Sequence, residues 1–184
     1  MRLFVSVDLP EAFAASIEEV QRAVDGASGL SFTDPDQAHV TLKFLGDVDE
    51  AALDETVDAI EAGVEKADVD PFECSVEGVG VFPSLEYISV LWLGVGAGSD
   101  SLTALHESIE ERAIDAGFEP EDHEFTPHAT IARMDHAGGK ELVQEFVENR
   151  HPEIGTFTVE EVRLKESDLR PDGPVYSTVE RFEL

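Results

Sequence analysis

The stretch Ala38-His39-Val40-Thr41-Leu42-Lys43-Phe44-Leu45-Gly46 alternates polar and apolar side chains. Such alternation predicts a β-strand, because successive side chains of a strand point to opposite faces of its sheet. The polar residues, expected on one face, are His39, Thr41 and Lys43. The apolar residues, expected on the core-facing side, are Val40, Leu42 and Phe44. One face would therefore present an imidazole, a hydroxyl and an ammonium group.

A second His-x-Thr pair occurs in the later stretch Pro127-His128-Ala129-Thr130-Ile131-Ala132-Arg133. Six histidines and nine threonines in this chain predict only about 0.3 such pairs by chance. Both pairs are followed by an aliphatic residue, and each lies on an expected strand in its own half of the chain. Two strands that each offer an imidazole and a hydroxyl predict a paired acid–base site.

The charge of the chain is strongly negative, with 41 acidic against 12 basic residues and a net charge of −29. The acids are interleaved with periodic apolar positions, and 42% of the residues are hydrophobic, so we expect a folded protein rather than a disordered one. We interpret the acidity as that of a halophile's cytoplasmic enzyme. So few basic residues argue against a nucleic-acid binder that works through a broad basic patch.

The sequence also argues against disulfide bonds, cysteine-bound zinc and membrane segments. A single cysteine, Cys74, excludes an intrachain disulfide and a cysteine-based zinc cluster. The start of the chain resembles no signal peptide, and no apolar run approaches the roughly 20 residues of a membrane span. We expect a cytoplasmic monomer without membrane contact, metal or cofactor.

The expected secondary structure alternates between strands and helices. Helices are indicated by apolar residues spaced three or four positions apart, and their ranges are Glu11–Asp25, Asp49–Lys66, Asp100–Ala116 and Lys140–Arg150. Around the two His-x-Thr strands, further strands are expected at Arg2–Leu9, Leu30–Thr33, Pro71–Pro83, Tyr87–Val95, Thr156–Glu166 and Val175–Leu184. Gly78 and Gly80 suggest a bulge or twist in one of them.

Each half repeats the order helix, His-x-Thr strand, helix and further strands, which indicates a diverged duplication. We predict an α+β fold with two pseudo-symmetric lobes, each an antiparallel sheet backed by two helices, and a central cleft between the sheets. No polar linker divides the chain, so residues 1–184 are expected to form one two-lobed domain. The pattern leaves open which strands are exchanged between the lobes.

The chain resembles the 2H phosphoesterases, and among them the RNA 2′,3′-cyclic phosphodiesterases, also called 2′-5′ RNA ligases. The resemblance covers nearly the whole length, with Ile131 where leucine is more usual. The stretches that carry it are Arg2–Val7, His39–Gly46, Phe82-Pro83, Val90–Val95, His128–Arg133, Lys165–Leu169, Gly173 and Tyr176. It implies metal-independent hydrolysis of RNA or nucleotide 2′,3′-cyclic phosphate ends to 2′-phosphates, with reversible 2′-5′ RNA ligase activity as a further expectation.

The resemblance also implies roles for the paired motifs. His39 would be the proton donor to the leaving oxygen and His128 the proton acceptor from water, although the residues by themselves form a symmetric pair. Imidazole suits both roles because it titrates near neutral pH. The hydroxyls of Thr41 and Thr130 would donate to the non-bridging phosphate oxygens.

Two basic residues have open alternatives. Lys43 could bind phosphate from the face of His39 or lie solvated at the strand end. Strict alternation places Arg133 opposite His128, unless the strand ends or bulges at Ala132 and returns the guanidinium to the site. The resemblance favours the bulge. The aromatic residues Phe44, Phe82 and Trp92 could stack a base, but core packing is the preferred interpretation.

Competing functions have weaker support. The glycines of Gly94-Val95-Gly96-Ala97-Gly98 do not have dinucleotide-binding spacing, and the pairs Asp122-His123 and Asp135-His136 lack metal-ligand spacing on a helix. The alternative of a different class is a non-catalytic RNA- or nucleotide-binding protein of the same fold.

Overall fold

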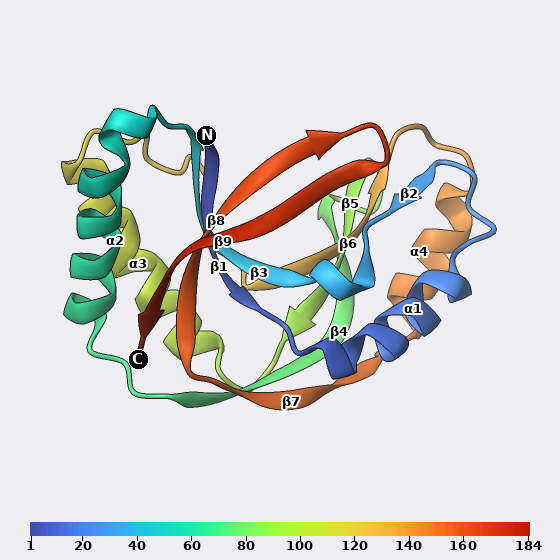
Figure 1. The fold of residues 1–184 in the computed structure, drawn as a ribbon. Helices are drawn as coiled ribbons and strands as arrows, with labels where there is room; N and C mark the ends of the chain where they lie inside the picture. The colour runs from blue at the N-terminus through green and yellow to red at the C-terminus, as the bar shows by residue number, and fades with distance from the viewer.

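The computed structural model describes all residues 1–184, which form two antiparallel sheets. Sheet A contains, from edge to edge, β3 (His39–Asp47), β1 (Arg2–Asp8), β8 (Glu161–Arg170) and β9 (Gly173–Glu183). Sheet B contains β2 (Leu30–Phe32), β6 (His128–Met134), β5 (Ile88–Val95), β4 (Phe72–Pro83) and β7 (Glu153–Val159). The α+β fold with two antiparallel sheets is thus confirmed (Figure 1).

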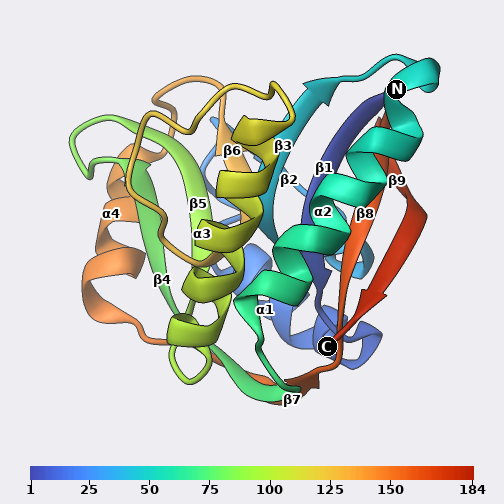
Figure 2. The same ribbon diagram turned by 90° about the vertical axis from the view of Figure 1, so that its left-hand side faces the viewer.

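Two helices cover each sheet, as predicted. Helices α2 (Leu53–Ala67) and α3 (Ser99–Asp115) pack against sheet A and lie in front of its strands in Figure 2. Helices α1 (Ala14–Ala23) and α4 (Lys140–Asn149) cover sheet B. Short 3-10 turns at Glu11–Phe13, Pro35–Gln37 and Glu50–Ala52 precede α1, β3 and α2. None of the helices combines the length and the apolar character of a membrane-spanning segment.

The two halves of the chain are interleaved. Helix α1 lies between β1 and β3 of sheet A in the sequence, yet it packs on sheet B. Helix α3 lies between β5 and β6 of sheet B, yet it packs on sheet A. Each lobe therefore takes a helix from the opposite repeat, and the buried apolar side chains form one continuous cluster.

Close packing of α2 on α3 depends on Gly63. A Cβ at Gly63 would lie 2.8 Å from the Cα of Ile109, so no larger residue fits without moving a helix. Around this contact Ile60, Leu105 and Ile109 are fully buried, and each such side chain contributes about 1.5–3 kcal/mol relative to an exposed one. This layer supports sheet A from behind and leaves its other face for the site.

One strand prediction was wrong. The stretch Thr156–Glu166 is not a single strand but parts of β7 and β8, which belong to different sheets. The chain leaves sheet B at Val159 and joins sheet A at Glu161, with only Glu160 between them. Neither glycine nor proline marks this crossing, and its only sign in the sequence is the polar pair Glu160-Glu161, which shifts the alternation by one residue.

Bulges interrupt both His-x-Thr strands just after the threonine. In β3, Thr41 pairs with Ser6 and Lys43 with Val5, which leaves Leu42 as the extra residue. The side chains after the bulge change faces, so Lys43 is buried on the core side and Phe44 is 63% exposed. The predictions that Lys43 shares the face of His39 and that Phe44 packs in the core are therefore wrong.

The bulge of β6 lies at the equivalent place. Thr130 pairs with Trp92 and Ala132 with Leu91, so Ile131 is the extra residue. Ile131 and Ala132 are both buried, and the exposed Arg133 returns to the face of Thr130. The alternative in which β6 bulges near Ala132 is confirmed. The register of β4 also shifts beside Gly78, which has a φ of 78°, as the glycines suggested.

Candidate active site

The two histidines come from the first residues of β3 and β6, strands of different sheets that lie close to one another. His39 and Thr41 share one face of sheet A, and His128 and Thr130 share one face of sheet B. The charge of His128 is among the influences that lower the pKa of His39, so the two imidazoles lie within electrostatic reach of one another.

Both imidazoles are oriented by the same local device. Nδ1 of His39 lies 2.8 Å from the carbonyl oxygen of Gln37, and Nδ1 of His128 lies 2.7 Å from that of Thr126. A carbonyl oxygen can only accept a hydrogen bond, so each Nδ1 carries a proton. In the neutral ring the lone pair is therefore on Nε2, which has no partner within the protein. Each histidine offers Nε2 for proton transfer.

Aromatic rings surround each histidine. The ring of His39 has its centroid 5.1 Å from that of Phe4 and 5.1 Å from that of Tyr176, which meets it edge-on. On the other sheet, Phe82 meets His128 edge-on at 4.9 Å, and Trp92 lies 5.9 Å away. Phe82 and Trp92 were predicted to be core residues; both are only partly buried and line His128 instead.

The position of the Trp92 side chain depends on a glycine opposite it on the neighbouring strand β4. Gly80 pairs with Trp92, and a Cβ at Gly80 would lie 2.3 Å from the indole ring. The indole therefore covers the bare backbone of β4 and lies beside His128. Gly80 was expected to mark a bulge or twist in the strand, but the sequence did not indicate that the Trp92 indole packs directly on it.

Burial is the main cause of a lowered pKa for both catalytic candidates. Desolvation lowers the pKa of His39 and of His128 below the ordinary 6.5, and the carbonyl hydrogen bonds oppose this only in part. Both imidazoles are consequently neutral at pH 7 in the free protein. An anionic ligand between them would favour the protonated form of one.

Two arginines supply positive charge without an ion-pair partner. Neither Arg2 nor Arg133 forms a salt bridge or a hydrogen bond through its side chain. The charge of Arg133 lowers the pKa of His128, and both arginines oppose the burial that raises the pKa of the Tyr176 phenol. Arg133 is therefore near the site, as the resemblance implied. No local pattern in the sequence marks Arg2 or Tyr176 as a functional residue.

Lys43 is not brought to the site. Its ammonium donates to the Glu110 carboxylate at 2.9 Å and to the Glu119 carbonyl at 2.6 Å, and the Glu121 carboxylate lies 3.6 Å away. The Lys43 side chain is 1% exposed. The structure therefore contradicts both a phosphate contact by Lys43 and a solvated place at the strand end, and it shows a buried ion pair between β3 and Glu110 of α3.

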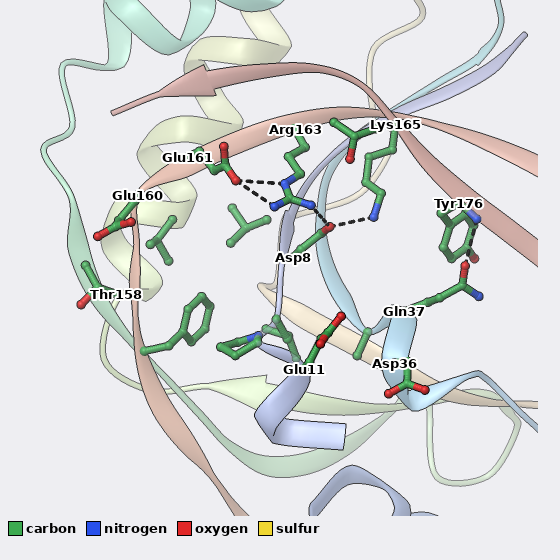
Figure 3. A pocket seen from close by; sticks show the side chains of 17 residues that line it. Asp8, Glu11, Asp36, Gln37, Thr158, Glu160, Glu161, Arg163, Lys165 and Tyr176 are labelled. Atoms are coloured by element: carbon green, nitrogen blue, oxygen red, sulfur yellow. Dashed lines mark hydrogen bonds and ion pairs between the residues drawn. The ribbon is translucent and has the colours of Figure 1, made fainter. Parts of the chain in front are cut away.

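A cavity of about 500 Å³ adjoins the His39 side of the site. It lies between sheet A, the strand β7 and the turn before β3, and Figure 3 shows its lining. On one wall the Asp8 carboxylate accepts from Arg163 at 3.0 Å and from Lys165 at 2.8 Å. Lys165 also lies 5.8 Å from the centroid of the Tyr176 ring. The cavity is thus lined by the ion pairs of Asp8 and by Tyr176, whose ring contacts His39.

No group of three or more His, Cys, Asp or Glu side chains comes together in a way that could hold a metal ion. The two His-x-Thr motifs instead present two imidazoles with free Nε2 atoms and two hydroxyls on the same strand faces, and β6 adds the unpaired guanidinium of Arg133. This set can donate and accept protons around an anion and can hydrogen-bond its oxygens.

Comparison with known proteins identifies relatives along the whole chain. Residues 9–170 match the family model of the 2′-5′ RNA ligase superfamily. A Methanothermobacter thermautotrophicus protein is 34% identical over 186 residues, covering 100% of this chain and 99% of that one. An Archaeoglobus fulgidus protein is 34% identical over 184 residues, covering 100% of both. Both relatives are named RNA 2′,3′-cyclic phosphodiesterase.

The fold is shared with solved structures. The crystal structure of TT0787 from Thermus thermophilus has a TM-score of 0.81 and 29% identity, covering 100% of this chain and 98% of that one. Escherichia coli LigT, crystallised with 3′-AMP, has a TM-score of 0.77 at 22% identity and covers 100% and 97%. The resemblance seen in the sequence is confirmed: the chain belongs to the 2′-5′ RNA ligase superfamily.

Proposed function

We propose that this protein hydrolyses 2′,3′-cyclic phosphates at RNA ends or on nucleotides to 2′-phosphomonoesters. The observation that carries the proposal is the pair of imidazoles, each held at Nδ1 by a main-chain carbonyl and free at Nε2. The names of relatives that match the chain from end to end support the same reaction. We assign the proton donor to His39 and the proton acceptor to His128.

The reaction needs one proton removed and one supplied. Nε2 of His128 takes a proton from water as the water oxygen bonds to phosphorus, and protonated His39 gives its Nε2 proton to the 3′ oxygen as that P–O bond breaks. Thr41 and Thr130 donate hydrogen bonds to the non-bridging oxygens, and the guanidinium of Arg133 offsets their charge. No step in this scheme requires a metal ion. A 5′-hydroxyl in place of water would give 2′-5′ ligation by the same transfers.

The protonation states follow from the site. Burial leaves both imidazoles neutral at pH 7, which suits His128 as a base. The negative charge of a bound cyclic phosphate raises the pKa of an adjacent imidazole and so favours the protonated form that His39 needs. The substrate therefore helps to create the acid that acts on it.

The test is turnover of a nucleoside 2′,3′-cyclic phosphate in high salt with a chelator, followed as formation of the 2′-monophosphate. We expect His39→Ala and His128→Ala each to lower kcat by about 10²–10⁴-fold. His151→Ala, at a largely exposed histidine outside the site, is the matched control and should retain activity. No turnover by the wild type, or undiminished turnover by either site variant, would refute the proposal.

Two other results would point elsewhere. Tight binding of the cyclic phosphate without any turnover would support a non-catalytic RNA- or nucleotide-binding protein. Activity abolished by the chelator and restored by a divalent cation would support a metal hydrolase.

We also propose that the acidic composition adapts the enzyme to a cytoplasm with concentrated salt. A net charge of −29 repels an anionic substrate in dilute buffer, whereas at 1 M salt the Debye length is only about 3 Å and that repulsion is screened. A monomer suffices for the reaction, because one chain supplies both histidines.

A further inference from the structure

Gln37 uses its main chain and its side chain for two different contacts beside the site. Its carbonyl oxygen holds Nδ1 of His39 at 2.8 Å. Its side-chain Oε1 accepts from the main-chain N–H of Tyr176 at 2.9 Å, and its Nε2 donates to the carbonyl of Pro174 at 3.1 Å. Both ends of the amide are therefore engaged by the first residues of β9, as the dashed contact in Figure 3 shows for Tyr176.

The contact joins segments that the sheet itself keeps apart. β3 and β9 are the opposite edges of sheet A, with β1 and β8 between them. Gln37 ends the turn that leads into β3, and its amide presents one acceptor and one donor to β9, as a neighbouring strand residue would. The hairpin formed by β8 and β9 is thus tied at its far end to the residue that orients His39.

The strand that Gln37 holds also carries a ring that covers His39. The Tyr176 side chain meets the His39 ring edge-on at 5.1 Å and the Phe4 ring edge-on at 5.2 Å. Movement of β9 away from Gln37 would remove this ring from His39 and admit water. Because desolvation is the largest cause of the lowered pKa of His39, such movement would raise that pKa.

The other histidine has no such connection. The carbonyl of Thr126 holds His128, but the Thr126 side chain forms no hydrogen bond. Sheet B does contain a comparable glutamine contact, in which Nε2 of Gln144 donates to the Leu85 carbonyl at 2.7 Å and ties α4 to the turn between β4 and β5. Gln144 forms no hydrogen bond with His128, so it provides a matched control.

We propose that Gln37 is a positioning residue for His39, which it keeps oriented and covered by tying the β8–β9 hairpin to the turn before β3. The kinetic part of this inference rests on the proposed function, whereas the structural part does not. Gln37 itself need not touch the substrate, and its effect is exerted through the His39 ring and Tyr176.

The experiment compares Gln37→Met, which keeps the length of the side chain but loses both hydrogen bonds, with Gln37→Ala and Gln144→Ala. We expect both Gln37 variants to lower kcat by about tenfold with KM changed less than about threefold, since a misoriented acid affects the chemical step more than binding. Gln144→Ala should retain the kcat of the wild type. The alkaline limb of the pH profile should move to higher pH only in the Gln37 variants.

A second readout does not depend on activity. In ¹⁵N NMR of the full chain, the ring nitrogens of His39 should shift and titrate at higher pH in the Gln37 variants, while those of His128 should stay as in the wild type. Unchanged His39 signals, or equal changes in both histidines, would refute the positioning role. A wild type without turnover would refute the proposed function, and the NMR comparison would still decide the role of Gln37.

Discussion

Replacing Lys43 tests whether this lysine supports the fold or binds phosphate. Lys43→Met removes an ammonium that donates to Glu110 at 2.9 Å and to the Glu119 carbonyl at 2.6 Å, in a place where the lysine side chain is 1% and the Glu110 side chain 15% exposed. The variant leaves a mostly buried carboxylate without its partner. Breaking such a pair costs about 3–5 kcal/mol of the free energy of unfolding.

Urea unfolding at a fixed high concentration of KCl measures this cost. With a slope of about 2 kcal/mol per M, the loss should move the midpoint down by roughly 2 M. Lys66→Met is the matched control, because the Lys66–Glu111 pair is 44% and 56% exposed and exposed pairs contribute little. Removing the carboxylate as well, in Lys43→Met/Glu110→Gln, should restore much of the stability.

Activity separates the two roles of Lys43. In the folded fraction, kcat/KM of Lys43→Met should stay within about threefold of the wild type, since the ammonium lies behind the sheet rather than on the face of His39. A midpoint no lower than that of Lys66→Met, or a large fall in kcat/KM of a stably folded variant, would refute this reasoning.

Three further outcomes are expected. Because burial lowers the pKa of both His39 and His128 below the ordinary 6.5, more than half of the acid has lost its proton at pH 6.5, and log kcat/KM should fall above that pH towards a slope of −1; a flat profile up to pH 8 would contradict this. Thr130→Val should lower kcat by about 10²–10³-fold, whereas the same change at Thr156 in β7 should have little effect. Affinity for inorganic phosphate, measured by calorimetry, should hold or rise from dilute to molar salt; a steep fall would indicate binding by counterion release.

Much of the fold was predictable because it depends on local periodicity. All four helices were expected within a few residues of their observed positions, since their apolar residues recur at helical spacing and face a sheet. The pairing of the two His-x-Thr motifs was equally visible, because each histidine and threonine precede the bulge and obey simple alternation.

What was missed depends on contacts between distant residues. A bulge in β3 leaves no mark in the sequence, since Leu42 and Lys43 are ordinary strand residues. The buried lysine is tolerable because distant groups, chiefly the Glu110 carboxylate on α3 and the Glu119 carbonyl, accept its hydrogen bonds. Arg2 and Tyr176 come from opposite ends of the chain and share an environment only after folding. The crossing at Glu160 was missed because its only mark is a one-residue shift in the alternation, in which Val159 is followed by Val162 as the next apolar residue.

The equivalent bulges in β3 and β6 divide each strand into a part that is the same in both repeats and a part that differs between them. The residues before the bulge form the same pair in both repeats, whereas the first outward residue after it is Phe44 in one and Arg133 in the other. A duplicated scaffold can thus present an apolar ring on one side and a guanidinium on the other without changing its shared acid–base groups. The one-residue offset therefore makes the two sides of the cleft chemically unlike while the two His-x-Thr pairs stay equivalent.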